Sequence, residues 1–241
     1  MKNILISGVS QGLGLTTSRL LLEQGYKVYG VARREVVEFE QLKEMYPGRF
    51  VHILADLADH ESACEEIFKK HIGFDVALHG FVNNAAMAYD DIISNLQYDP
   101  LLKMYQVNVF TPMMITKQVI RNMLLHRTQG SIIHISSISV HTGYKGLAMY
   151  ASTKGALEAF SKTTAREWGE RGIRSNSIVA GFMDTSMSST LSHEQKDRIY
   201  KRTSLKMATT AESVAAMIEF LLSEKSDSIT GVNHFVDSGT I

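Results

Sequence analysis

The chain has 241 residues, 44% of them apolar, and its 25 basic side chains balance its 25 acidic ones. That apolar share supplies a substantial core and argues against intrinsic disorder. A net charge of zero leaves no basic surface for nucleic acid or an anionic membrane, and no apolar run approaches the ~18 residues that cross a bilayer. The single cysteine, Cys64, is typical of a reducing compartment. We therefore expect a soluble, cytoplasmic protein without a secretory signal.

Short runs rich in β-branched residues alternate with longer amphipathic segments along the chain. The runs predict strands at Lys2–Ser7, Lys27–Ala32, Phe50–Leu54, Val76–Val82, Ser131–Ser136, Arg174–Val179 and His234–Val236. The segments between them predict helices at Leu13–Gln24, His60–His71, Pro100–His126, Met149–Arg171 and Ala211–Ser223. Gly25 is expected to cap the first helix, because glycine enters the left-handed region without a Cβ penalty.

The order of these elements predicts the fold class. Strands joined by helical crossovers must run parallel, and near-continuous apolar strands are typical of a sheet covered on both faces. We therefore expect an α/β fold with one doubly wound parallel sheet of about seven strands and helices on both faces. No change of composition marks a boundary, so residues 1–241 are expected to form a single domain.

A glycine-rich loop joins the first predicted strand to the first helix, with the sequence Ser7-Gly8-Val9-Ser10-Gln11-Gly12-Leu13-Gly14. Glycines there allow a tight turn, close approach of the backbone to a pyrophosphate, and close packing of helix on strand. The helix N-terminus adds unpaired N–H groups and the positive end of its dipole. A glycine cluster alone also fits an ordinary turn, but this strand–loop–helix context predicts a nucleotide site.

Two arginines, Arg33 and Arg34, follow the second predicted strand, and Arg33 lies 19 residues after Gly14. An acidic side chain at about this distance binds the ribose hydroxyls of NAD, whereas an arginine pairs with the 2′-phosphate of NADP. The alternative is a solvated surface arginine. We expect NADPH to be preferred over NADH.

Polar residues also follow the third and fourth predicted strands, as Asp56-Leu57 and as Asn83-Asn84-Ala85. The carboxyl ends of parallel strands border the ligand crevice, so these residues are expected to contact the cofactor. The alternatives are that Asp56 is an ordinary N-cap for the helix near Asp59 and that the asparagines form an ordinary turn.

Tyr150 and Lys154 are four residues apart in a predicted helix, so they lie about one turn apart on one face. A phenol with a pKa near ~10 is a poor acid at neutral pH, and a neighbouring ammonium would lower that pKa. A hydroxyl from Ser136 or Ser137, at the end of the fifth strand, would hold a carbonyl oxygen. Such a Tyr–Lys pair also occurs by chance on solvated helices, but with the glycine loop it predicts a proton-transfer site.

These motifs resemble those of one family, the short-chain dehydrogenases/reductases. The resemblance covers the whole chain, from Gly8-x-x-x-Gly12-x-Gly14 through Asn83-Asn84-Ala85 and Ser137 to Tyr150-x-x-x-Lys154 and the final strand. Ser137 lies 13 residues before Tyr150, which is similar to the family's spacing and selects Ser137 over Ser136. Within the family the chain is most similar to the bacterial 3-oxoacyl-[acyl-carrier-protein] reductases.

The resemblance implies a Rossmann-type fold and a catalytic group of Asn108, Ser137, Tyr150 and Lys154. Tyr150 would protonate the ketone oxygen as hydride arrives from NADPH, and Ser137 would polarise the carbonyl. Lys154 would lower the pKa of Tyr150 and bind the nicotinamide ribose. Asn108 would hold a water that relays protons to Lys154, although by spacing alone it is a polar residue in a helix interior.

The resemblance also implies cofactor contacts along the whole chain, with Met183 and Thr185 at the nicotinamide amide. The full set is Gly8, Ser10, Gln11, Gly12, Leu13, Gly14, Arg33, Arg34, Asp56, Leu57, Asn84, Ala85, Tyr150, Lys154, Gly181, Met183 and Thr185. The chain departs from the family pattern at Ala86, Ala180 and Ser238, where glycine, proline and glycine are usual. The first two departures lie beside the expected cofactor site and leave the substrate open.

The activity implied is the NADPH-dependent reduction of a ketone to a secondary alcohol, with a 3-oxoacyl thioester as substrate. A sugar, a steroid or another small ketone or alcohol is the alternative substrate. A non-catalytic NADP-binding sensor would not need Ser137, Tyr150 and Lys154 together. A sugar-nucleotide epimerase would need an added substrate domain, for which the chain after Val179 leaves little room.

Further expectations concern partners and the last third of the chain. Arg127 and Arg171 lie near positions where carrier-protein reductases have docking arginines for the acidic acyl carrier protein. The resemblance implies that the long helices pair between subunits of a homodimer or homotetramer. The segment Phe182–Met207 lacks strand periodicity and would close over the site as a mobile lid. The nine histidines show no ligand-like spacing, so no metal is expected.

Overall fold

The computed structural model describes residues 1–184 and 192–241. Within these ranges a seven-stranded parallel sheet has the strand order β3-β2-β1-β4-β5-β6-β7. The strands are β1 (Asn3–Ser7), β2 (Lys27–Ala32), β3 (Phe50–Leu54), β4 (Gly80–Asn83), β5 (Gly130–Ser137), β6 (Ile173–Ala180) and β7 (Asn233–Val236). This order confirms the predicted α/β class and the doubly wound parallel sheet.

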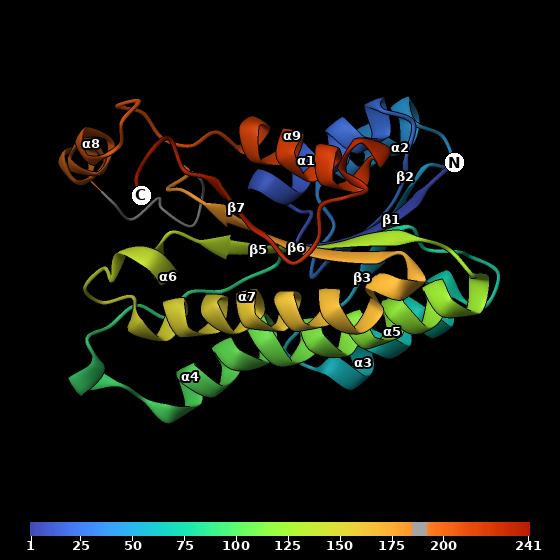
Figure 1. The fold of residues 1–241 in the computed structure, drawn as a ribbon, viewed down its shortest axis with the longest axis horizontal. Helices are drawn as coiled ribbons and strands as arrows, with labels where there is room; N and C mark the ends of the chain where they lie inside the picture. The colour runs from blue at the N-terminus through green and yellow to red at the C-terminus, as the bar shows by residue number, and fades with distance from the viewer. Residues whose placement is uncertain (185–191) are drawn as a thin grey trace.

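Helices cover both faces of the sheet, as Figure 1 shows. One face carries α1 (Gly12–Glu23), α2 (Val37–Met45) and α9 (Ala211–Leu222), and the other carries α3 (His60–Cys64), α4 (Tyr98–Tyr105), α5 (Thr111–His126) and α7 (Ala148–Trp168). The short α6 (Ser139–Thr142) and α8 (His193–Arg202) lie beyond the carboxyl ends of the strands (Figure 1). In the described part of the chain, no helix combines the length and the apolar composition needed to span a membrane.

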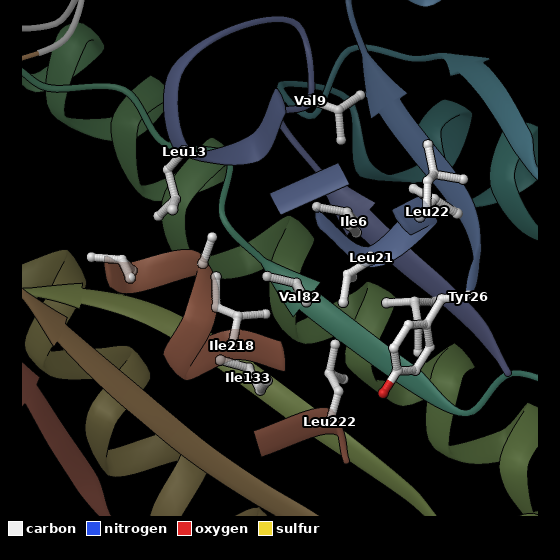
Figure 2. Packing of buried hydrophobic residues seen from close by; sticks show 14 of the residues in the cluster. Ile6, Val9, Leu13, Leu21, Leu22, Tyr26, Val82, Ile133, Ile218 and Leu222 are labelled. Carbon is white, nitrogen blue, oxygen red and sulfur yellow. The ribbon is translucent and has the colours of Figure 1, made fainter. Parts of the chain in front are cut away.

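Two buried hydrophobic clusters, one on each face, hold the helices on the sheet. On the face of α1 and α9, one buried cluster includes Leu21 and Leu22 of α1, Ile218 and Leu222 of α9 and Ile133 of β5 (Figure 2). All five side chains are buried, and each contributes about 1.5–3 kcal/mol relative to exposure. The glycine loop before α1 is thereby fixed on the sheet.

The predicted strands agree closely with the observed ones, except that β4 begins four residues later than predicted, at Gly80. The side chain of Asn122 on α5 accepts from the Leu78 N–H at 2.8 Å and donates to the Val76 carbonyl at 2.9 Å. These bonds satisfy the backbone of residues 76–78 outside the sheet ladder. Helices α2, α6 and α8 were not predicted.

The predicted helix Pro100–His126 is two helices, α4 and α5, joined by a π-helical segment at Gln106–Phe110. Pro112 lacks an N–H, so it cannot donate to the carbonyl of Asn108 four residues earlier. The Thr111 N–H bonds instead to the Gln106 carbonyl, five residues earlier. Such π-helical turns often occur at functional sites, and this one contains Asn108.

The strand order reverses between β1 and β4, which are neighbours in the sheet. In open α/β sheets, ligands bind outside the carboxyl ends of the strands at such a reversal. The glycine loop follows β1 and Asn84 follows β4, so both lie at this point.

Candidate active site

The glycine loop between β1 and α1 has a conformation that side chains would block. Gly8 and Gly12 have φ angles of +77° and +54°, in the left-handed region. A Cβ on Gly14 would lie 2.1 Å from the Gly8 carbonyl oxygen, and one on Gly8 would lie 2.9 Å from Cα of Ala85. The N-cap of α1, Gln11, makes no capping hydrogen bond through its side chain. The first-turn N–H groups therefore remain available to an anion, as a dinucleotide pyrophosphate requires.

Asn84 holds this loop from the neighbouring strand. Its Nδ2 donates to the carbonyl oxygens of Ser7 at 2.9 Å and Gly8 at 3.1 Å. The Ser7 hydroxyl accepts from the N–H groups of Asn84 at 3.1 Å and Ala85 at 3.0 Å. The asparagine-rich turn thus fixes the shape of the glycine loop.

The two arginines after β2 are exposed, so their guanidinium groups are accessible to a phosphate. Arg34 donates to the side-chain oxygen of Gln11 at 3.1 Å, which joins the end of β2 to the start of α1. Arg33 is adjacent to this bridge in the chain. Gln11 was expected as a cofactor contact, but its bond to Arg34 could not be predicted from the sequence, because it joins residues 23 positions apart.

Asp56 and Leu57 follow β3, but Asp56 is not the helix N-cap considered above. Its carboxylate accepts from the Ala58 N–H at 3.0 Å in a local turn, whereas Asp59 caps α3 by accepting from Glu61 and Ser62. The Leu57 carbonyl accepts from the Thr111 hydroxyl at 2.7 Å, next to the π-helical segment. The exposed Asp56 side chain lies at the same sheet edge as the glycine loop.

Tyr150 and Lys154 both lie on α7, near its N-terminal end. The Lys154 Nζ donates to the Ile135 carbonyl of β5 at 2.8 Å and lies 5.6 Å from the centre of the Tyr150 ring. Lys154 is only 2% exposed, and burial lowers its pKa to about 8. Its ammonium is therefore still the main form at pH 7 but loses its proton more easily than an exposed lysine does.

The structure contradicts the expectation that Lys154 lowers the pKa of Tyr150. Burial raises the pKa of this phenol above its usual value, and the negative charge of Asp90 raises it further. The phenol is consequently protonated at neutral pH, in the form that can donate a proton. Asp90 had not been singled out in the sequence, where nothing connects it with a tyrosine 60 positions later.

Ser137 is the last residue of β5, opposite Ala180 of β6. Its hydroxyl accepts from the Ser139 N–H at 3.2 Å, which leaves its proton available for another acceptor. Ser136 instead donates to Glu158 on α7. The choice of Ser137 over Ser136 thus agrees with the hydrogen bonding, because the Ser136 hydroxyl proton is already used.

Asn108 is fully buried in the π-helical segment. Its side chain accepts from the Met87 N–H at 2.9 Å and donates to the Met87 carbonyl at 2.8 Å and the Thr153 hydroxyl at 3.1 Å. The side chain therefore links the segment after β4 to α7. Because Pro112 cannot donate to it, the main-chain carbonyl of Asn108 is the atom better suited to hold a water.

The region after β6 is closely packed. A Cβ on Gly181 would lie 2.2 Å from the Thr209 hydroxyl and 2.6 Å from Cα of Asp237. Met183 packs against the cluster beneath α1 and α9. Thr185 lies outside the described residues. The predicted lid Phe182–Met207 contains α8, and Phe182 contacts Tyr200 of that helix at 6.1 Å between ring centres.

Arg127 and Arg171 are both exposed and precede β5 and β6, respectively. The Gly130 N–H bonds to the Gly172 carbonyl at 3.3 Å, so the segments that lead into β5 and β6 lie side by side. They lie at the amino edge of the sheet, the opposite edge from Ser137. An eight-residue strand, about 26 Å long, separates the two edges.

Comparisons with known proteins agree along nearly the whole chain. A family model described as enoyl-(acyl carrier protein) reductase matches residues 8–240. The chain is 31% identical over 241 residues to the 3-oxoacyl-[acyl-carrier-protein] reductase of Salmonella typhimurium, covering 99% of this chain and 96% of the relative. It is 30% identical over 242 residues to the L-xylulose reductase of Caenorhabditis elegans, covering 99% and 95%. A solved gluconate 5-dehydrogenase from Burkholderia cenocepacia, in complex with NADP and tartrate, has a TM-score of 0.92 at 26% identity, covering 99% of this chain and 94% of that chain.

Proposed function

The chain belongs to the short-chain dehydrogenase/reductase family. On that premise we propose that it uses NADPH to reduce a 3-oxoacyl thioester to the 3-hydroxyacyl thioester. It is an oxidoreductase of CH–OH and C=O groups. The observation that carries the proposal is the placement of Tyr150, Lys154 and Ser137 at the sheet edge that also holds the glycine loop. A sensor of NADP would need the loop alone.

The glycine loop and its flanks would hold the cofactor. The N–H groups of the first turn of α1 would bind the pyrophosphate, and Arg33 with Arg34 would bind the 2′-phosphate. Bound there, the cofactor supplies a hydride to the carbonyl carbon of the substrate. The close fit of Gly8 and Gly14 against their neighbours suits a backbone that must approach phosphate oxygens closely.

The chain's own groups would supply the proton. Ser137 donates a hydrogen bond to the carbonyl oxygen, and Tyr150 transfers its phenolic proton to that oxygen as negative charge develops there. The raised pKa of Tyr150 keeps this proton in place until the oxygen becomes basic. Lys154 and a water on the Asn108 carbonyl then return a proton to Tyr150. One hydride and one proton thus convert the ketone to a secondary alcohol.

The thioester substrate is supported by the 3-oxoacyl reductase relative, whereas the xylulose and gluconate enzymes favour a sugar substrate. The test is the rate of NADPH oxidation with acetoacetyl-N-acetylcysteamine, L-xylulose and 5-ketogluconate, with NADH in parallel. Crotonyl-N-acetylcysteamine tests the C=C reduction that the family description names. The proposal expects the 3-oxo thioester to have the highest kcat/KM. A higher value for either sugar would transfer the assignment to sugar ketones.

Carrier and subunit partners are part of the same proposal. Arg127 and Arg171 would dock an acyl carrier protein, and because both lie at the amino edge, the carrier would serve the active site of another subunit of the oligomer rather than Ser137 of the same chain. Exposed apolar side chains on α4, on the π-helical segment and on α5, at Leu102, Phe110 and Leu125 respectively, are suited to pairing in a homodimer or homotetramer. Arg127→Glu should raise KM for the carrier-bound substrate without changing KM for the N-acetylcysteamine thioester.

A further inference from the structure

A buried carboxylate lies behind the candidate active site, and the mechanism above does not use it. Glu158 is one helical turn after Lys154 on α7 and is 8% exposed. It accepts a hydrogen bond from the Ser136 hydroxyl of β5. The Asn233 amide of β7 donates to its second oxygen at 2.6 Å, and His141 Nε2 of α6 lies 3.1 Å from both oxygens. We call Glu158, Ser136, His141 and Asn233 the Glu158 cluster.

A buried carboxylate costs several kcal/mol unless donors surround it, and an apolar side chain would fill the same space without that cost. The Glu158 cluster meets the requirement with three donors from three different elements. The carboxylate therefore joins α7 to β5, α6 and β7.

That place is directly beside Ser137. The helix α7 holds two successive residues of β5, through Lys154 on the Ile135 carbonyl and through Glu158 on the Ser136 hydroxyl. Ser137 is the next residue in the strand. Any shift of this strand end along α7 would change the distance between the Ser137 and Tyr150 hydroxyls, which must reach one carbonyl oxygen together.

The cluster also holds the chain after Ser137. His141 is on α6, whose N–H groups bond to the Ile138 carbonyl, and its ring packs against Phe235 with ring centres 5.0 Å apart. Ser137 is thus bracketed by residues 136 and 141, both bound to Glu158.

We propose that Glu158 is a positioning residue that fixes the Ser137 hydroxyl relative to Tyr150. This inference rests on the proposed function in that a reacting carbonyl must meet both hydroxyls. A displacement of about 1 Å at a reacting centre can cost about 100-fold in rate. Loss of the Glu158 bonds should therefore lower turnover more than it lowers stability.

The test compares variants of the cluster with a matched control. Glu158→Gln replaces an acceptor oxygen by an NH₂ group that faces donors, and Ser136→Ala removes one bond and little volume. The control is Ser161→Ala, because Ser161 lies on α7 one turn after Glu158 and is buried with its hydroxyl 2.9 Å from that of Ser175 on β6. All three lose a buried bond between α7 and the sheet, but only the first two affect residues next to Ser137.

In steady-state assays, Glu158→Gln and Ser136→Ala should lower kcat about 10- to 100-fold, with the Kd of NADPH within about twofold of the wild type. Ser161→Ala should keep nearly full kcat at a similar loss of unfolding free energy. Ser136→Thr keeps the hydroxyl and should restore most of the activity lost in Ser136→Ala. Equal kcat losses in Ser161→Ala and Ser136→Ala would overturn the proposal.

A second readout needs no substrate. Amide hydrogen exchange in the NADPH-bound protein should be faster across residues 136–142 in Glu158→Gln and Ser136→Ala, and unchanged there in Ser161→Ala. Unchanged exchange in both cluster variants would overturn the positioning role. If the wild type turned over no ketone, the proposed function would fail, and the exchange result would still decide whether Glu158 positions Ser137. Ser136→Ala, the mildest change, keeps the test valid if Glu158→Gln does not fold.

Discussion

The Lys154 ammonium is bound to the Ile135 carbonyl on β5 at 2.8 Å, while the Tyr150 ring one turn away lies 5.6 Å from it. Helix α7 and strand β5 are thus joined at the point where the proton donor and the serine must cooperate. Burial removes water from the ammonium, which disfavours its charged form and lowers its pKa to about 8.

Replacing Lys154 should therefore separate stability from activity. Lys154→Met removes a desolvated charge at similar volume, so we expect the free energy of unfolding at pH 7 to rise by about 1–3 kcal/mol while kcat falls at least about 100-fold. The stability gap should narrow between pH 8 and 10.5, where the unfolded wild type binds more protons than the folded protein and its stability rises with pH. Urea unfolding at pH 7 and pH 10 measures both. A less stable Lys154→Met variant at pH 7 would contradict this view.

The exposed Arg33 should determine the preference for NADPH. Arg33→Asp removes a charge-assisted contact with the 2′-phosphate, so we expect the Kd of NADPH to rise about 10- to 100-fold while that of NADH changes little. Arg19→Asp, on the exposed side of α1, makes the same charge change away from the loop end and is the control. Titration of cofactor fluorescence measures each Kd. Equal weakening of both cofactors would refute the phosphate assignment.

Asp90 should help to keep Tyr150 protonated at alkaline pH. The reaction needs a proton on this phenol and a proton on Lys154, whose pKa of about 8 is the lower of the two, so the phenol is followed directly rather than through activity. Because the Asp90 charge raises the pKa of Tyr150, Asp90→Asn should move the ionisation of this phenol to lower pH, by about one unit or less. The measurement is tyrosinate absorbance against pH, with Asp99→Asn on the exposed start of α4 as the control. A shift to higher pH, or equal shifts in both variants, would rule out this role of Asp90.

A buried histidine in β5 should make the fold sensitive to acid. His134 is fully buried, and burial lowers its pKa to about 3, with the charge of Lys154 as a smaller cause. The unfolded state binds its proton near pH 6.5, so stability falls as pH decreases from 6.5 towards 3, by about 1.4 kcal/mol per unit at most. His134→Val should flatten this decline in urea unfolding between pH 6.5 and 4.5. An unchanged slope would place the acid sensitivity elsewhere.

The parts of the site that could be predicted from sequence are those with local signals. The Gly8–Gly14 loop follows a strand and opens a helix, and Tyr150 and Lys154 share a helix face, so a short window of residues contains each pattern. The π-helical turn at Asn108 also had a local signal, Pro112 four residues later, which the helical periodicity concealed.

What could not be predicted depends on contacts between distant segments. Asp90 and Tyr150 meet only when the loop after β4 folds over the start of α7, where the Asp91 N–H bonds to the Gly146 carbonyl at 3.0 Å. The bond between Gln11 and Arg34 and the joint at Glu158 likewise need the strand order and register. The direction of the Tyr150 pKa shift was wrong in the sequence-based prediction because burial and the Asp90 charge, which both depend on tertiary packing, raise this pKa.

The most direct test of proton donation by Tyr150 is the rate of NADPH oxidation with acetoacetyl-N-acetylcysteamine in the wild type and in Tyr150→Phe. We expect rapid turnover by the wild type, and in the variant a loss of at least about 100-fold in kcat with the Kd of NADPH unchanged. Near-normal turnover by Tyr150→Phe would contradict the assignment of the proton donor.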